Sequence, residues 1–440
     1  MKKNMVVESW GRFPHAPQCA HPVHWRADIA AHLSQLARKQ KHTLAFGNGL
    51  SYGDSCLASS GHVLDMRQVD RFLSADWDEG VIRAEAGVTL EVVLALAIPR
   101  GWFLPVTPGT RYVTLAGAVA NDVHGKNHHV RGTFGNHVRR LHLVRSDGPD
   151  QECSPRENAD MFAATIGGLG LTGIITWVEL QLMPIRSSRI VGTSIRFGSL
   201  DEFFTLSNEL DPLHEYTVAW IDCLARGSDA GRGVYMVGNH ALDGCLEIDP
   251  GRQLSVPFVL PFSAVNQLSL RLFNTIYYRA RKSGRHSQVI PYAPFFYPLD
   301  KILHWNRLYG PRGFQQYQCV IPECHAEAAM LEILRTVATS GTGSFLAVLK
   351  RCGDVCSPGL LSFPLPGTTL ALDFPRGRDT NNSLFPRLDA IVRAAGGRLY
   401  PAKDAAMRGE DFRAFYPNWE QLESLRDPVL CSRFWKRVTP

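Results

Sequence analysis

The chain has 440 residues, of which 45% are hydrophobic and 20% are charged. This length exceeds what one hydrophobic core supports, and the composition excludes a disordered or fibrous protein. The formal net charge is only +6 and basic residues are mixed with acidic ones, so nucleic acid is not expected as a partner.

The ten cysteines stand at irregular spacings, and Cys352 and Cys356 form the one close pair. This pattern indicates reduced thiols and a cytoplasmic protein. The N-terminus carries Lys2, Lys3 and Glu8 without the apolar stretch of a secretory signal. Because no apolar run approaches the roughly 20 residues that cross a bilayer, no transmembrane helix is expected.

The first part of the chain predicts a strand-rich α+β domain over residues 1–185. Short β-prone runs alternate with glycine-rich loops and two helical patterns. The strands are expected at 43–46, 62–66, 81–84, 138–144 and 174–182, and the helices at 89–98 and 160–166.

The pattern then changes to longer strands separated by helices, which predicts a substrate domain over residues 186–397. An antiparallel sheet covered by helices is the expected architecture. Its strands are expected at 216–224, 234–237, 315–321, 345–349 and 369–374, with a helix at 327–336. The last segment, 398–440, is too short to fold alone and is expected to return to the first domain.

The sharpest local feature is the glycine-rich loop at residues 47–54. Its three glycines allow backbone N–H groups to turn inward as a nest that suits a pyrophosphate, and Ser51 adds a hydroxyl donor. The alternative is an ordinary glycine-rich turn. A second small-residue stretch, 114–129, favours the first interpretation because it allows close backbone approach to a flat ligand.

Two other motifs resemble a metal site and a dinucleotide site, and neither is expected to act as one. His124, His128 and His129 resemble a metal site, but zinc usually adds a cysteine or carboxylate, and Lys126 would repel a cation. No metal is therefore expected. The stretch 168–173 matches a dinucleotide fingerprint, yet a helix pattern precedes it and a strand follows, which is the reverse of a Rossmann unit.

The motifs together resemble the flavin-binding domain of the vanillyl-alcohol oxidase (PCMH-type) superfamily. More closely, they are similar to the decaprenylphosphoryl-β-D-ribofuranose 2-oxidase family. The matching motifs run in order through both domains: Ser51-Tyr52-Gly53-Asp54, Val106-Thr107-Pro108-Gly109-Thr110, His124-Gly125-Lys126-Asn127-His128-His129, Phe134-Gly135-Asn136-His137-Val138, Leu171-Thr172-Gly173-Ile174-Ile175, Phe296-Tyr297-Pro298-Leu299-Asp300, Trp305-Asn306-Arg307, Gln316-Tyr317-Gln318, Leu361-Ser362-Phe363-Pro364, Asp373-Phe374-Pro375 and Leu399-Tyr400-Pro401-Ala402-Lys403-Asp404.

The resemblance implies an FAD that is bound non-covalently. In related soluble sugar oxidases a histidine holds the flavin covalently at the position of Leu50, which cannot form that bond. The implied cofactor-binding residues are Gly47, Asn48, Gly49, Leu50, Ser51, Tyr52, Gly53, Asp54, Ser55, Gly109, Thr114, Leu115, Ala116, Gly117, Asn121, Asp122, Val123, His124, Ile174 and Tyr400.

The same resemblance implies the catalytic and substrate-binding residues. Oxidation of an alcohol needs a base for the hydroxyl proton, and Lys403 is the first candidate, with Tyr297 or His124 as alternatives. The residues expected to bind substrate are Lys126, Gln316, Gln318 and Lys350, of which the two lysines suit a phosphate.

The implied activity is oxidation of the C2 hydroxyl of a polyprenylphosphoryl-ribofuranose, after which an NAD-dependent ketoreductase would complete epimerisation to the arabinose donor. The sequence departs from the family pattern at two positions that concern cofactor and substrate contacts: Leu50 replaces a family arginine, and Ala371 replaces a cysteine of the mycobacterial enzymes.

The alternative functions are an oxidase or dehydrogenase of a soluble sugar, alditol or aldonolactone, and a non-catalytic flavin-binding scaffold. Bleaching of the flavin by substrate distinguishes an enzyme from a scaffold.

One segment suits the inner face of a membrane. Residues 256–285 begin apolar and end with the aromatic and basic residues Tyr277, Tyr278, Arg279, Arg281, Lys282 and Arg285. Such residues favour lipid headgroups and suggest peripheral membrane contact. The alternative is a surface helix whose apolar stripe packs on the protein.

Overall fold

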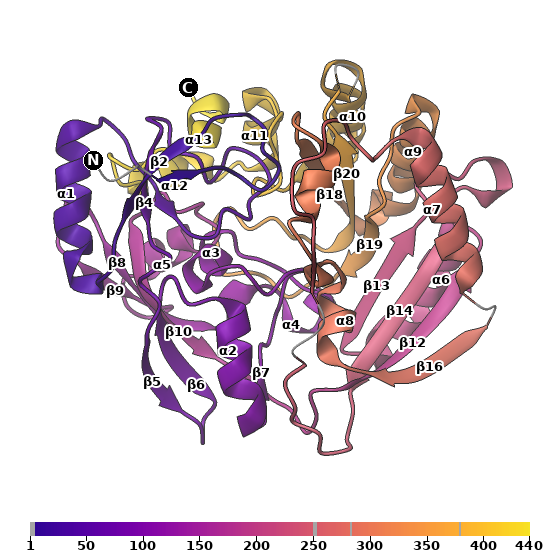
Figure 1. Ribbon diagram of the computed structural model, residues 1–440, viewed down its shortest axis with the longest axis horizontal. Coiled ribbons are helices and arrows are strands. Elements are labelled where there is room, and N and C mark those ends of the chain that lie inside the picture. The colour runs from indigo at the N-terminus through magenta and orange to yellow at the C-terminus, as the bar shows by residue number, and fades with distance from the viewer. Residues whose placement is uncertain (1–4, 250–252, 282–283, 378–379) are drawn as a thin grey trace.

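The computed structural model describes residues 5–249, 253–281, 284–377 and 380–440. The chain forms two lobes side by side, and the C-terminal helices lie against the first lobe (Figure 1). Helices and strands are mixed in both lobes, which confirms the α+β prediction. The predicted limits at residues 185 and 397 stay predictions.

The first lobe contains two sheets. The smaller has the order β1-β2-β4-β3 and the larger β5-β6-β10-β8-β9. Their strands are β1 (Met5–Val7), β2 (Gln18–Pro22), β4 (His62–Asp65) and β3 (Ala45–Phe46), then β5 (Phe72–Asp76), β6 (Val81–Glu85), β10 (Ile174–Gln181), β8 (Val138–Val144) and β9 (Gln151–Cys153). The helices are α1 (Ile29–Lys39), α2 (Leu90–Ala97), α3 (Leu115–Ala120), α4 (His128–Arg131) and α5 (Ala159–Thr165).

Local sequence explains these elements. Thr89 caps α2 by accepting a hydrogen bond from the backbone of Val92, and the buried leucines and valines of α2 face the core. The fingerprint-like stretch 168–173 forms turns between α5 and β10, so the predicted order of a helix before it and a strand after it is confirmed. Two short strands, β7 (Trp102–Phe103) and β11 (Met183–Pro184), pair beside the larger sheet.

The second lobe is built on one eight-stranded sheet in which every pair is antiparallel. Its order is β16 (Arg285–Ile290), β12 (Ile190–Phe197), β14 (Gly233–His240), β13 (Tyr216–Ile221), β19 (Ala347–Cys352), β20 (Gly367–Pro375), β18 (Phe314–Pro322) and β21 (Arg398–Leu399). The helices of this lobe are α6 (Leu200–Leu210), α7 (Gln267–Ala280), α8 (Tyr292–Phe296), α9 (Glu323–Ser340) and α10 (Phe385–Ala394). A two-stranded ribbon joins β15 (Leu254–Ser255) to β17 (Ile302–Leu303).

Strand alternation divides this sheet into two faces. On β18, Tyr317, Cys319 and Ile321 are buried in the core beside α9 and α10. Gln316 and Gln318 alternate with these residues along the strand and therefore point to the opposite face, which is turned toward the first lobe. The sheet thus presents polar side chains to the interface between the lobes.

The C-terminal segment crosses from one lobe to the other. Its strand β21 pairs with β18, and its helices α11 (Gly409–Phe415), α12 (Trp419–Leu425) and α13 (Arg433–Val438) follow. Backbone bridges join Leu430 to Thr43 and Ser432 to Ala58 in the first lobe. Figure 1 shows these helices beside the N-terminal sheet.

Segment 256–285 contains α7, and Lys282 lies outside the described residues. One side of α7 packs on the protein: Leu270 is buried and Tyr277 lies 4.6 Å from the ring of Trp220. A second stripe of Leu268, Leu272 and Ile276 is exposed. None of the helices in the described part of the chain has the length and apolar character that a transmembrane span requires.

Candidate active site

The glycine loop follows β3 and packs against three other segments. A Cβ atom on Gly47 would lie 2.5 Å from the Thr114 hydroxyl, and one on Gly53 would lie 1.6 Å from the carbonyl oxygen of Asp404. Gly49 adopts a positive φ of 63°, which L-residues rarely adopt. These positions require glycine because backbone or side-chain atoms occupy the space of a side chain.

The loop leaves a set of donors free for a ligand. Within the described residues, the backbone N–H groups of Asn48, Gly49, Leu50 and Ser51 make no hydrogen bond to protein. The buried Ser55 hydroxyl also has no partner there. Consecutive free amides beside an orphaned hydroxyl fit a diphosphate, since its oxygens accept such hydrogen bonds. The residues present therefore fit the pyrophosphate of FAD.

The side chain of Asn48 holds the loop to the second stretch by donating a 2.6 Å hydrogen bond to the Tyr112 carbonyl. Thr114 in turn caps α3 by accepting a hydrogen bond from the Gly117 amide. Ala116 is half-buried beside it. The structure thus brings the two predicted FAD segments, 47–55 and 114–117, into contact.

Several predicted cofactor residues have structural roles. Leu115, Val123 and Ile174 are buried in hydrophobic cores, so only their backbones remain for a ligand, whereas Gly109 is exposed with open space around it. The carboxylate of Asp54 accepts hydrogen bonds from Arg437 at 2.8 and 3.1 Å.

Asp122 joins the lobes. Its buried carboxylate accepts hydrogen bonds from the Gly135 amide and from the hydroxyls of Ser357 and Ser362. Burial raises its pKa. On the same side, the Tyr400 hydroxyl donates to the Asn121 carbonyl at 2.8 Å, which anchors the C-terminal segment to the stretch after α3.

Three lysines meet between the lobes, and we call Lys126, Lys350 and Lys403 the lysine cluster. His124 lies at its centre: its Nδ1 is 2.7 Å from Lys350 Nζ and its Nε2 is 3.1 Å from Gln318 Nε2. Burial, then the charge of Lys350, lowers the pKa of His124 well below its usual value. The imidazole is therefore neutral at pH 7 and can accept hydrogen bonds.

Lys403 has the environment of a base. Its Nζ lies 3.9 Å from the ring centre of Tyr52, and burial lowers its pKa to about 8, an effect that nearby Asp373 partly offsets. Asp373 is fully buried, accepts a 2.7 Å hydrogen bond from Gln316, and has its pKa raised to about 7 by burial. A neutral amine is thus accessible near neutral pH.

Lys126 and Tyr297 are held at the edge of this arrangement. Lys126 donates to the Phe295 carbonyl at 2.5 Å, and burial, with a smaller effect from Lys350, lowers its pKa to about 8. Tyr297 shares a 2.7 Å hydrogen bond with the Thr107 hydroxyl, and burial raises its pKa. A phenol with a raised pKa stays protonated near pH 7 and cannot accept a proton, so the pKa shifts favour Lys403 over Tyr297 as the base.

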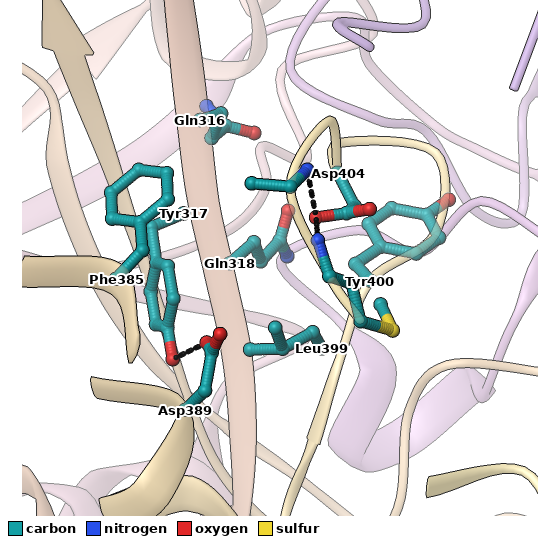
Figure 2. Close-up of a pocket in the computed structure, with 10 residues that line it drawn as sticks. Gln316, Tyr317, Gln318, Phe385, Asp389, Leu399, Tyr400 and Asp404 are labelled. Atoms are coloured by element: carbon teal, nitrogen blue, oxygen red, sulfur yellow. Dashed lines mark hydrogen bonds between the residues drawn. The ribbon is translucent and has the colours of Figure 1, made fainter. Parts of the chain in front are cut away.

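Figure 2 shows a small cavity beside β18, with a volume of about 10 Å³. Tyr317 and Gln318 point to opposite sides of the strand, and Tyr317 donates a 2.9 Å hydrogen bond to Asp389 on α10. Gln318 points toward Tyr400. This space holds about one water molecule and is part of the packing behind the site.

Sequence reasoning assigned no role to Asp373 or Phe363. Asp373 is flanked by Leu372 and Phe374 within β20. An acidic residue inside an apolar strand is a local signal of a functional site, and this signal was overlooked. Phe363 stacks on Tyr400 with ring centres 4.7 Å apart and lies 5.5 Å from the His124 ring. Its position depends on the fold and left no local signal.

Comparison with known proteins identifies the family. Residues 17–154 match the FAD binding domain family. The chain is 36% identical to decaprenylphosphoryl-β-D-ribose oxidase of Mycolicibacterium smegmatis over 90% of this chain and 88% of that protein, and 34% identical to an uncharacterised protein of Streptomyces coelicolor over 78% and 96%. L-gulonolactone oxidase of Mus musculus is 32% identical over 34% of each chain. The chain therefore belongs to the decaprenylphosphoryl-β-D-ribose oxidase family of FAD-dependent oxidoreductases.

Proposed function

We propose that the protein oxidises the C2 hydroxyl of a polyprenylphosphoryl-ribofuranose to a ketone. The observation that carries the proposal is the gathering of the lysine cluster and His124 between the lobes. The lysine amines supply a base in the neutral form and a phosphate site in the charged form. The name of the M. smegmatis relative supports the same substrate class.

In the proposed reaction, bound FAD supplies the hydride acceptor for the carbinol hydrogen. The neutral amine of Lys403 accepts the hydroxyl proton as the C2–H bond breaks, which yields the 2-keto sugar. Burial favours this neutral amine because it penalises the ammonium form. Asp373 limits the decrease in the pKa of Lys403 and accepts a hydrogen bond that holds Gln316 in place, so Asp373 is a positioning residue.

The phosphate of the substrate is assigned to Lys126 and Lys350. Burial lowers the pKa of both amines, and an added anion would favour their charged forms. Gln318 and neutral His124 supply hydrogen-bonding groups for the sugar hydroxyls. A soluble sugar without a phosphate would leave these desolvated cations unpaired.

Anaerobic mixing of the purified holoenzyme with candidate substrates tests the proposal. Polyprenylphosphoryl-ribofuranose should bleach the flavin band, whereas ribose, xylitol and L-gulono-1,4-lactone should not. Bleaching by the lactone or the alditol alone would favour the soluble-sugar alternative, which the similarity to L-gulonolactone oxidase suggests. No bleaching by any of the four compounds would overturn the oxidase proposal and favour the scaffold.

We also propose that FAD is held without a covalent bond. The side chain of Leu50 is aliphatic and has no nucleophilic atom that could bond to the flavin. Acid precipitation should therefore release all of the yellow colour into the supernatant. Colour that stays with the denatured protein would contradict this part of the proposal.

Peripheral contact with a lipid surface follows from the proposed substrate. Exposed apolar residues on α7 and the preceding loop are flanked by the exposed Arg271, Arg279 and Arg281. The apolar residues are Leu254, Phe258, Phe262, Leu268, Leu272 and Ile276. Apolar groups flanked by arginine suit an anionic bilayer. We propose that the inner face of the membrane presents the lipid-linked substrate there, and that a separate NAD-dependent reductase consumes the keto product.

Sedimentation with vesicles tests the membrane contact. Wild-type protein should sediment with vesicles that contain anionic lipid, and the pair Leu272→Glu with Ile276→Glu should abolish this. Val92→Glu is the matched control, since Val92 is an exposed apolar residue on α2 of the first lobe. Equal sedimentation of all three proteins would contradict the contact.

A further inference from the structure

A second cluster of reactive side chains lies in the first lobe, apart from the lysine cluster. Cys19 and His21 stand on β2, and His62 stands on the neighbouring parallel strand β4. Cys19 and His21 share a face because they are two residues apart on a strand, and His62 is the register partner of Cys19. The sheet therefore brings three metal-ligating side chains together.

The spacing of these groups fits a single ion. The Sγ of Cys19 and one nitrogen each of His21 and His62 all lie within 4.8 Å of one another. His21 Nε2 is 3.0 Å from His62 Nδ1. Ligand atoms around a tetrahedral zinc lie roughly 3.3–3.6 Å apart, so a small rotation of each side chain would complete three bonds.

The donor atoms are of the types that zinc binds. All three residues are half-buried. One cysteine sulfur and two imidazole nitrogens are donor types that zinc prefers, and water can take the fourth position.

We propose that Cys19, His21 and His62 form a site for one zinc ion. The ion would link β2 to β4, and β4 pairs with β3, the strand that leads into the glycine loop. Bound zinc would therefore brace the sheet that carries the pyrophosphate loop. This site has no local sequence pattern, because 40 residues separate His21 from His62.

Zinc retention tests the site. The holoenzyme is incubated with Zn²⁺ and desalted in a buffer with a weak chelator, and zinc, flavin and protein are then quantified. Wild-type protein should retain about one zinc per chain, and Cys19→Ser and His21→Gln should each lower the affinity by about tenfold or more. Cys324→Ser is the matched control, because Cys324 is an exposed thiol on α9 in the other lobe.

The flavin spectrum reports whether each variant is folded, since none of these residues belongs to the flavin site. Alkylation of wild-type protein gives a second measurement if a variant does not fold. Zinc should slow modification of Cys19 by about tenfold, because the bound thiolate is withheld, and should leave Cys324 unchanged. Zinc retention that survives both substitutions, or Cys19 alkylation that zinc does not slow, would overturn the proposal.

Discussion

The glycine loop and the lysine cluster face the same interface but are built in different ways. The loop is continuous in sequence and presents backbone amides, which any set of residues with the right φ and ψ would supply. The cluster combines side chains from the stretch after α3, from β19 and from the C-terminal segment. Its chemistry depends on burial, which raises or lowers each pKa.

The difference separates cofactor binding from catalysis. Changes in the loop should release FAD and leave the lysines in place, while changes in the cluster should keep FAD and slow the reaction. Four substitutions test this separation, beginning with the one that should have the largest effect.

Lys403→Ala should have the largest effect. Loss of the base should slow anaerobic flavin reduction by roughly a thousandfold, since a positioned base contributes about 10²–10⁴-fold. Rapid-mixing absorbance measures the rate, and the bound FAD should be unchanged. Lys436→Ala, at an exposed lysine on α13, is the control. Reduction at the wild-type rate would remove Lys403 as the base.

Gly53→Ala should act on the cofactor instead. The new methyl group would lie 1.6 Å from the Asp404 carbonyl, so the loop must shift from the C-terminal segment. We expect FAD affinity to fall by about a hundredfold, from a strain of about 1–3 kcal/mol. Equilibrium titration of apoprotein with FAD measures this. Gly148→Ala, which meets no atom within 4 Å, is the control, and unchanged affinity in both would contradict the assigned loop.

Leu50→Arg should increase the affinity of the glycine loop for FAD. A guanidinium beside the free amides adds a charged partner for a phosphate, and we expect FAD to bind up to about tenfold more tightly at low salt. The same titration at two salt concentrations measures the gain, which should shrink at high salt. Leu50→Met preserves the apolar character and should leave the affinity unchanged. Weaker FAD binding by Leu50→Arg would place the diphosphate elsewhere.

Asp373→Asn should have the smallest effect on the rate of flavin reduction. It should shift the pH dependence of that rate. In wild-type protein, flavin reduction should rise with pH and level off above about 8, as Lys403 loses its proton. Asp373 raises the pKa of Lys403, so its removal should lower that pKa and increase the rate at pH 7 by about threefold. An unchanged midpoint would show that Asp373 does not act through Lys403.

The sequence predicted the elements best where a pattern is local. The strand at 138–144 and the helix that follows Thr89 lie at or within one residue of the predicted limits, because periodicity and capping are encoded in neighbouring residues. The glycine loop was predicted for the same reason. The pairing of His124 with Lys350 spans 226 positions, so only the resemblance to a known family indicated that both belong to one site.

Other features could not be derived from any local pattern. The residues around Asp373 do not predict its proximity to Lys403, because that proximity depends on how β20 and the C-terminal segment pack together. The helix α1 and the exposed second stripe of α7 were also not predicted. The stripe 268, 272 and 276 has helical spacing, but spacing alone does not show which side of a helix is covered.

The return of the C-terminal segment determines when the flavin lobe can be completed during synthesis. The amide of Tyr52 donates to the carbonyl of Ala402, Thr43 pairs with Leu430, and Asp54 is held by Arg437. A nascent chain that has released only the first lobe from the ribosome lacks all three contacts. The loop therefore gains these three contacts only after the last segment has been translated.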